Sequence, residues 1–180
     1  REGFAVVYPQ GTIDSEGNAF FNVGYEFHQT SKIDDVSFIR ELVLYLREEY
    51  QLSKKNTFAT GMSNGGDMSY LLACTSSDLF SAVAPVAGVM MKEILDNCNS
   101  KKPIPVFETH GTRDKISLFE GDIENQEGWG AYYGLPETIQ FWADKHSLDK
   151  SEYIQITSKS EGYQNDIIFE RYWSEDNLNE

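Results

Sequence analysis

The sequence lacks any apolar run long enough to span a bilayer, and it is poor in basic residues. Lysine and arginine together number 15, whereas aspartate and glutamate number 29, so the formal net charge at pH 7 is -14. A surface with this charge repels phosphate backbones and anionic lipids, which argues against nucleic acid and membrane as partners. The charge chiefly favours solubility, and it accommodates a neutral substrate more readily than an anionic one.

Cysteine is also scarce, with only Cys74 and Cys98 present. They do not form a CxxC pair, and no cluster of histidine and cysteine has the spacing of metal ligands, so the sequence predicts neither a metal site nor a cofactor. In an oxidising compartment the two could form a disulfide, worth roughly 3 kcal/mol of stability. Two buried free thiols are the alternative, and the cysteine count alone leaves both open.

The 180 residues suffice for one domain with a real core and are too few for two. No internal repeat, low-complexity tract or linker divides residues 1–180, which predicts a single domain. Strands alternate with helices, which predicts an α/β fold with a mostly parallel sheet and helices on both faces. The predicted strands span residues 4–8, 56–60, 82–87, 103–109, 153–157 and 167–173, and the predicted helices span residues 34–50, 66–73 and 135–146.

The predicted sheet is incomplete at both ends. The chain begins inside the apolar run at residues 4–8, which is typical of a buried strand in a parallel sheet. It ends in a polar tail, residues 174–180, directly after the last strand. We therefore expect strands on each side of this sheet to be missing from the 180 residues.

The pentapeptide Gly61-Met62-Ser63-Asn64-Gly65 lies between a predicted strand and a predicted helix. A GxSxG sequence in this position is typical of the elbow that carries the nucleophilic serine of an α/β hydrolase. Its glycines would let strand and helix approach closely, Ser63 would be the nucleophile, and the backbone N–H of Asn64 would stabilise the oxyanion. The alternative is a glycine-rich helix start with Ser63 as a capping residue.

Asp114 is the candidate for the acid that orients a catalytic histidine. It follows the predicted strand at residues 103–109. In α/β hydrolases the acid comes after the serine in the sequence, on a loop that follows a later strand. It holds the imidazole in the right tautomer and stabilises the imidazolium that forms. The alternative is a turn residue in an Arg-Asp loop.

The sequence contains three histidines, and none of them is assigned as the base. The base should follow the acid in the sequence, and only His146 does so. His146 lies near the end of a predicted helix, which favours a surface histidine. His110 is expected to pack beneath the loop of Asp114, and no motif supports His28.

Several further segments, taken together in their order along the chain, carry a resemblance. They cover residues 3–11, 21–24, 33–39, 60–68, 84–88, 110–114 and 137–142. In these segments the chain resembles the polyhydroxybutyrate-depolymerase-like esterases, a group that includes feruloyl and acetylxylan esterases. The resemblance implies that Ser63 is the nucleophile and Asp114 the acid of the triad. It also favours a bridge between Cys74 and Cys98, because the family can have one there.

The resemblance also has gaps. The histidine of this family lies in a glycine-rich segment that would follow Glu180, and one oxyanion donor lies in a His-Gly loop that would precede Arg1. Phe21 stands where a tryptophan is usual, and Phe27 and His28 stand where cysteines are often found. We therefore expect a fragment of a longer enzyme with little activity by itself; a degenerate relative is the alternative.

The implied function is a serine carboxylic-ester hydrolase that works through an acyl-enzyme on a neutral ester, small or polymeric. Hydroxyalkanoate, feruloyl and acetylxylan esters all remain open. A non-catalytic binding protein and a serine peptidase on the same fold are the alternatives. A secreted or periplasmic location is expected, although no signal peptide is visible. The sequence does not specify an oligomeric state.

The loop at residues 117–134 is the candidate for the substrate rim, because it follows the acid at the edge where open α/β sheets bind ligands. Its aromatic residues could offer flat faces to a sugar or a ferulate ring, and they include Trp129, Tyr132 and Tyr133. The alternative is that these aromatic side chains only pack the loop onto the domain.

Overall fold

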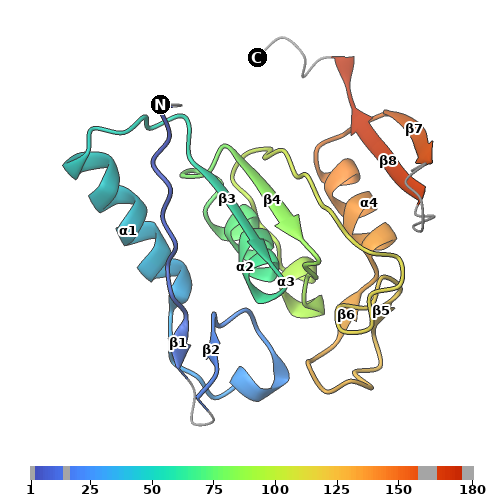
Figure 1. The fold of residues 1–180 in the computed structure, drawn as a ribbon, viewed down its shortest axis with the longest axis horizontal. Helices are drawn as coiled ribbons and strands as arrows, with labels where there is room; N and C mark the ends of the chain where they lie inside the picture. Colours follow the sequence, from blue (N-terminus) through green and yellow to red (C-terminus); the bar gives the residue numbers. More distant parts are fainter. Residues whose placement is uncertain (1–2, 14–16, 158–165, 176–180) are drawn as a thin grey trace. The chain divides into compact units, whose positions relative to one another are not determined.

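The computed structural model describes residues 3–13, 17–157 and 166–175. The chain divides into two compact units, Arg1–Thr138 and Ile139–Glu180, and each is described by itself. Figure 1 labels the helices and strands. The five residues at the end of the predicted polar tail, 176–180, lie outside the described residues.

The centre of the first unit is a pair of parallel strands. β3 (Phe58–Met62) and β4 (Ala82–Val86) run in register from Phe58 opposite Ala82 to Met62 opposite Val86. α2 (Asn64–Thr75) connects them and packs against both (Figure 1). A parallel pair needs such a crossover, because a tight turn can join only antiparallel strands. The predicted α/β class is confirmed.

A third extended segment continues the parallel arrangement beyond β4. Bridges join Val83 to Val106 and Val86 to Thr109, both parallel. The sequence predicted a full strand over residues 103–109, but the structure forms only these two isolated bridges there. Pro85 on β4 lacks the N–H that pairing between the two bridges needs, and Pro103 and Pro105 lack the N–H that pairing before Val106 needs, which explains the interruption.

α1 (Asp35–Glu49) agrees with the predicted helix at residues 34–50. Asp34 caps it by accepting a hydrogen bond from the Ser37 N–H at 2.9 Å. Ile39 is buried on its inner face. Near the C-terminal end, the buried Arg47 donates hydrogen bonds to the Thr57 hydroxyl and the Leu79 carbonyl, which ties this helix to the chain before β3.

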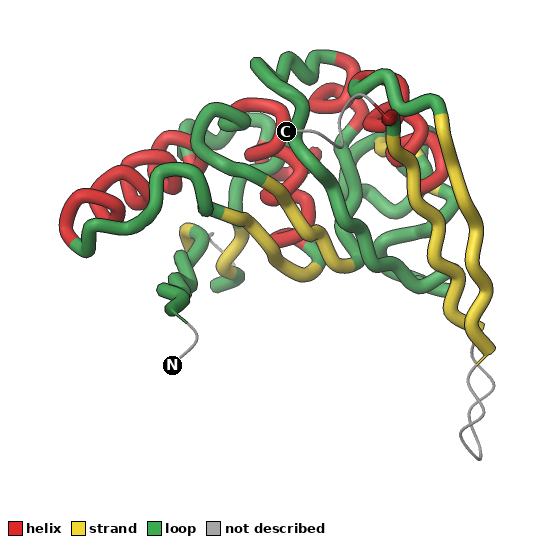
Figure 2. Tube along the Cα trace, turned by 90° about the horizontal axis from the view of Figure 1, so that it is seen from above, coloured by secondary structure: helices red, strands yellow, loops and turns green. Residues whose placement is uncertain are grey.

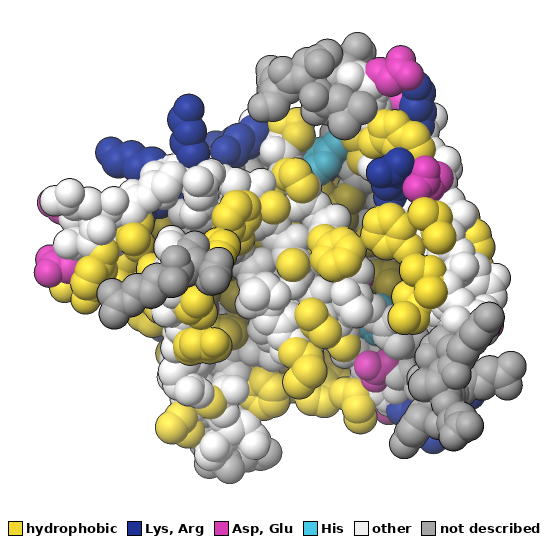
Figure 3. All heavy atoms as spheres, turned by 45° about the horizontal axis from the view of Figure 1, so that its top comes forward, with side chains coloured by type: hydrophobic (Ala, Val, Ile, Leu, Met, Phe, Trp, Pro, Cys, Tyr) yellow, Lys and Arg dark blue, Asp and Glu magenta, His cyan; other side chains and the backbone are white. Residues whose placement is uncertain are grey.

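The prediction of a buried strand at residues 4–8 is wrong. This segment pairs with no strand of the described chain, and Phe4 and Tyr8 are 80% and 90% exposed. An apolar run becomes a buried strand only where neighbouring strands and covering layers meet it. The space-filling view in Figure 3 shows many apolar side chains at the surface. The chain that follows this segment forms a short antiparallel pair, β1 (Thr12–Ile13) with β2 (Ala19–Phe20).

The remaining elements of the first unit are short. η1 (Glu26–His28) follows β2, α3 (Lys92–Asp96) follows β4, and β5 (Gly121–Asp122) pairs antiparallel with β6 (Tyr132–Tyr133). Buried side chains between these elements form the core, and the largest include Tyr70, Val83, Met90, Ile104 and Tyr132.

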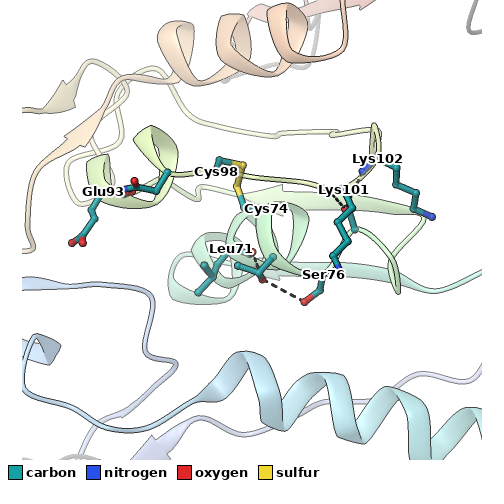
Figure 4. Close-up of a disulfide and its surroundings, with 10 residues drawn as sticks. Leu71, Cys74, Ser76, Glu93, Cys98, Lys101 and Lys102 are labelled. Atoms are coloured by element: carbon teal, nitrogen blue, oxygen red, sulfur yellow. Dashed lines mark hydrogen bonds between the residues drawn. A yellow bond between two sulfur atoms is a disulfide. The ribbon is translucent and has the colours of Figure 1, made fainter.

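A disulfide joins Cys74 near the end of α2 to Cys98 just after α3, with the two Cα atoms 5.0 Å apart (Figure 4). The bridge that the resemblance favoured is confirmed. It fixes the segment after β4 to the helix that follows Ser63.

The second unit contains most of α4 (Leu135–Lys145) and a long antiparallel hairpin. β7 (Lys150–Thr157) and β8 (Asp166–Trp173) run side by side along their whole length (Figure 2). Lys150 lies opposite Trp173, and Thr157 lies opposite Asp166. The predicted helix at residues 135–146 and the two predicted late strands are confirmed. None of the helices in the described ranges is both long and apolar enough to cross a bilayer.

Candidate active site

Ser63 occupies a sharp corner between β3 and α2. Its backbone has φ 53° and ψ -121°, in a region that non-glycine residues rarely adopt. The Ser63 N–H donates to the Val86 carbonyl at 2.9 Å, and the Ser63 carbonyl accepts from the Asp67 N–H at 2.9 Å. The residue itself is exposed. The corner therefore presents the hydroxyl to solvent and does not bury it inside a helix.

Two glycines make this corner possible. A Cβ on Gly61 would lie 2.5 Å from the carbonyl carbon of Gly65, and a Cβ on Gly66 would lie 2.9 Å from the Cα of Gly88. A Cβ on Gly65 would meet nothing within 4 Å. The close approach of strand and helix thus requires Gly61 and Gly66, and Gly65 contributes its backbone to the contact.

Asn64 is the first residue of α2, where the backbone N–H has no partner within the helix. Its side chain accepts a hydrogen bond from the Phe21 N–H at 2.8 Å and donates one to the Phe21 carbonyl at 3.0 Å. The amide therefore acts like a short strand partner for the chain just after β2. This pair of bonds fixes the orientation of the residue whose N–H the sequence predicted as an oxyanion donor.

A cavity of about 20 Å³ lies beside Ser63. It is room for about one water molecule. We call it the Ser63 hollow. It brings together the elbow, the turn after Asp114 and part of the predicted rim, and its lining consists of Tyr25, Ser63, Asp67, Val89, Ile116, Ser117, Trp129 and Tyr132.

Asp114 begins a tight turn next to this hollow. One carboxylate oxygen, Oδ1, accepts hydrogen bonds from the Ile116 N–H at 2.8 Å and the Ser117 N–H at 3.0 Å. This is the turn that aspartate side chains commonly form. Asp114 is not part of the lining, but its turn carries Ile116 and Ser117 into it.

His110 packs beneath the turn of Asp114, as the sequence predicted. Its Nε2 lies 2.8 Å from the Ser117 carbonyl, and its Nδ1 lies 3.2 Å from Glu108 Oε1. The side chains of His110 and Glu108 are only 1% and 3% exposed, respectively. Burial lowers the pKa of His110, but the hydrogen bonds with Glu108 and Ser117 outweigh burial and leave the pKa above its usual value. His110 therefore supports the loop and does not reach the elbow.

The other two histidines take different positions. His28 belongs to a group of rings in which its centroid lies 4.5 Å from that of Phe27. His146 was expected at the surface, and this is wrong. It is half-buried, with its ring centroid 5.6 Å from that of Trp142, and burial lowers its pKa.

The three predicted rim residues separate into two groups. Trp129 lies against Tyr25, with ring centroids 5.4 Å apart, and Tyr132 is buried with its hydroxyl accepting a bond from the Leu118 N–H. Both of these predicted residues line the Ser63 hollow. Tyr133 lies by α3 instead, where its hydroxyl donates to Asp96 Oδ1 at 3.1 Å.

Sequence reasoning missed Asp67. It is only 4% exposed, and it accepts hydrogen bonds from the Tyr25 hydroxyl at 2.5 Å and the Val89 N–H at 2.7 Å. Burial raises the pKa of the Asp67 carboxyl to about 7, although these two hydrogen bonds lower it. The signal in the sequence was a carboxylate one helical turn after Ser63, on a helix otherwise filled with apolar and small residues. In the described ranges, no group of three or more histidine, cysteine, aspartate or glutamate residues could hold a metal ion.

Comparison with known proteins assigns the chain to a family. A model of the prolyl oligopeptidase family matches residues 1–120. The chain belongs to the prolyl oligopeptidase family. The part that matches this family contains both Ser63 and Asp114, so the elbow and the acid turn lie within the shared fold.

Individual relatives are named as esterases. The chain is 31% identical over 147 residues to feruloyl esterase B of Piromyces equi, covering 79% of this chain. It is 25% identical over 127 residues to a bifunctional acetylxylan esterase/xylanase of Neocallimastix patriciarum, covering 69% of this chain. It is 33% identical over 95 residues to a probable feruloyl esterase C of Aspergillus niger, covering 52% of this chain.

These relatives confirm the resemblance to feruloyl and acetylxylan esterases. The matched segments cover 27%, 17% and 34% of the lengths of the three proteins. The chain therefore spans about a third or less of each of them.

Proposed function

We propose that this chain carries the nucleophile of a serine carboxylic-ester hydrolase that acts on plant cell-wall esters of the feruloyl or acetylxylan type. The observation that carries the proposal is the exposed Ser63 at a positive-φ corner between a parallel strand and a helix. Relatives named feruloyl esterase and acetylxylan esterase support the choice of ester. We further propose that β3 and β4 belong to a mostly parallel sheet of the α/β-hydrolase type, with helices on both faces.

The proposed reaction is acyl transfer to water. A base takes the proton of the Ser63 hydroxyl while its Oγ attacks the ester carbonyl. The oxyanion that forms accepts a hydrogen bond from the Asn64 N–H. The side-chain amide of Asn64 is bonded to the backbone of Phe21, which holds this residue in place. Collapse of this intermediate breaks the ester bond, and the departing alcohol takes the proton from the base. Water then attacks the acyl-enzyme in the same way and regenerates Ser63.

The acid and the base are part of the proposal. Asp114 is the proposed acid, supported by its turn beside the Ser63 hollow. None of the three histidines is among the residues that line this hollow, and His110 is bound to Glu108 and Ser117. We propose that the base comes from a segment of the protein outside these 180 residues.

The substrate would approach from solvent, because a cavity of about 20 Å³ holds no acyl group. Trp129 and Tyr132 are the proposed rim residues, since both line the hollow beside Ser63. The disulfide between Cys74 and Cys98 supports a secreted or periplasmic location, where disulfides persist.

A fluorophosphonate probe on the full-length protein tests the proposal, because an activated serine is labelled and a bystander is not. Ser63→Ala should abolish both labelling and the hydrolysis of feruloyl and acetylated xylan esters. Ser53→Ala, which changes an exposed serine away from the elbow, is the matched control and should keep both. Undiminished labelling of Ser63→Ala, or cleavage of a peptide amide in preference to either ester, would refute it.

A further inference from the structure

The carboxylate of Asp67 joins three separate parts of the first unit. Its own backbone N–H donates to the Ser63 carbonyl, which places it one helical turn beyond the elbow. Its Oδ2 accepts the hydroxyl of Tyr25, which precedes η1, at 2.5 Å. Its Oδ1 accepts the N–H of Val89, in the segment between β4 and α3, at 2.7 Å. Each oxygen thus holds a different loop.

Both of these loops border the Ser63 hollow. Tyr25, Val89 and Asp67 line it together with Ser63. A carboxylate suits this position because it accepts two hydrogen bonds at a fixed separation and donates none when ionised. Burying such a group is unfavourable unless it is well bonded, and charge-assisted bonds of this kind offset the cost. An apolar side chain would fill the space but would not fix the two loops.

Resting on the proposed function, we propose that Asp67 is a positioning residue for the reaction at Ser63: its carboxylate holds the Tyr25 and Val89 sides of the hollow in register with the elbow. This role is distinct from that of Asp114, which shapes the turn that carries Ile116 and Ser117. Asp67 does not touch the substrate in this role, and it acts through Tyr25 and Val89.

The groups that face Asp67 come from several elements. Glu108 lies within the third parallel segment and His110 directly after it, Tyr132 lies on β6, and Tyr70 lies on α2 itself. Glu108 raises the pKa of Asp67 and His110 lowers it, but burial is the largest influence and brings the pKa to about 7. Burial and the neighbouring Asp67 raise the pKa of Tyr25 well above its usual value, so Tyr25 remains the proton donor of the pair. The Asp67 carboxyl therefore changes its protonation state near neutral pH.

Three variants separate the roles of shape and charge. Asp67→Ala removes both hydrogen bonds. Asp67→Asn keeps the shape, since its Oδ1 can still accept from Val89 and its Nδ2 can donate to the Tyr25 oxygen, but it cannot ionise. Tyr25→Phe keeps the ring beside Trp129 and removes one bond to the carboxylate. The control is Asp78→Asn, because the Asp78 carboxylate also accepts two hydrogen bonds, both from Arg40, but does not line the hollow.

The experiment measures the rate of fluorophosphonate labelling of Ser63 against pH in the full-length protein, under conditions where circular dichroism shows each variant folded. Asp67→Ala should label at least about tenfold more slowly, because small displacements of reacting groups cost one to two orders of magnitude in rate. Asp67→Asn should recover much of this loss and should lack the step that Asp67 adds to the pH profile near neutrality, while the pH dependence of the base remains. Tyr25→Phe should move that step to higher pH, because the bond from Tyr25 lowers the pKa of Asp67. Asp78→Asn should match the wild type.

The outcomes distinguish this inference from the proposed function. If the wild type is not labelled at Ser63, both fail. If the wild type is labelled and folded Asp67→Ala reacts at the same rate, the positioning role fails and the proposed function stands. If Asp67→Ala does not fold, the pH profiles decide, and a profile of Asp67→Asn identical to that of the wild type overturns the inference.

Discussion

The side-chain amide of Asn64 exchanges two hydrogen bonds with the backbone of Phe21, 43 positions earlier in the chain. An isolated helix start would leave the first backbone N–H pointing in a loosely defined direction. Here the bonds to Phe21 lock the residue that carries the proposed oxyanion donor. The chain after β2 and the start of α2 therefore behave as one structural piece at the elbow.

Replacing Asn64 tests this relationship. Asn64→Ala removes both bonds and leaves the Phe21 N–H and carbonyl partly buried without that partner, so the free energy of unfolding should fall by about 1 to 3 kcal/mol. Urea unfolding measures the change. The exposed Asn56 gives a matched control, and Asn56→Ala should remain within about 0.5 kcal/mol of the wild type. Equal stability of Asn64→Ala and Asn56→Ala would contradict the assigned role.

The glycines of the elbow motif should differ in their tolerance. Gly61→Ala places a Cβ 2.5 Å from the backbone of Gly65 and should destabilise the fold by about 3 kcal/mol or more, at the upper end of overpacking. Gly65→Ala meets nothing within 4 Å and lies in a helix, where alanine is favoured, so its stability should stay within about 1 kcal/mol of the wild type. Thermal unfolding of both variants measures these changes in stability. A larger loss for Gly65→Ala than for Gly61→Ala would show that the packing of this corner is misassigned.

The disulfide should contribute to stability through the unfolded chain. Cys74 and Cys98 are separated by 24 positions, and closing a loop of this size contributes roughly 3 kcal/mol in the chain-entropy model. Cys74→Ala with Cys98→Ala should lower the midpoint of urea unfolding, and a reductant should lower that of the wild type in the same way. The double variant is its own control, because reductant should not affect it. A reductant effect of equal size in that variant would assign the loss to something other than this bridge.

The raised pKa of Asp67 predicts how stability depends on pH. The Asp67 carboxyl has a pKa of about 7 in the folded chain, against an ordinary value of 3.8. Between these values the folded chain holds a proton that the unfolded chain has released, so the free energy of unfolding falls as pH rises through this range and levels off above it. The fall is on the order of 1.4 kcal/mol for each unit by which the two pKa values differ.

The measurement is urea unfolding of the wild type and of Asp67→Asn at several pH values across this window. The free energy of unfolding of the wild type minus that of Asp67→Asn should fall steadily from about pH 4 to about pH 7 and then stay constant. The control Asp78→Asn should show no such trend in this window, because the bond from Arg40 lowers the pKa of Asp78 to about 2. A constant difference between the wild type and Asp67→Asn throughout the window would mean that Asp67 ionises normally in the folded chain.

Local patterns were sufficient for the helices and for the elbow. The apolar spacing at residues 34–50 predicted α1 within one residue at each end, and proline at the start of residues 135–146 predicted α4. Glycine and serine types at residues 61–65 predicted the strand-to-helix corner, because few other residues fit there. In each of these cases the decisive interactions join residues that are close in the sequence.

Patterns failed where distant parts of the chain decide. The apolar run at residues 4–8 has the composition of a buried strand, yet Phe4 and Tyr8 are exposed because no described strand pairs with it. Tyr132 and Tyr133 are adjacent and identical in type, yet one lines the Ser63 hollow and the other binds Asp96. Alternation along a strand sends neighbouring side chains to opposite faces, and only the packing shows which face meets the hollow.

The sequence by itself determined the α/β class, the corner at Ser63 and the residue types available for acyl transfer, since these follow from backbone preference and from the order of short motifs. Only the tertiary structure decided that Asp67 joins Tyr25 and Val89 and that Asn64 holds Phe21. These contacts link residues far apart in the chain, and their strength depends on burial, which excludes water from the bonds and shifts the pKa of the groups that form them.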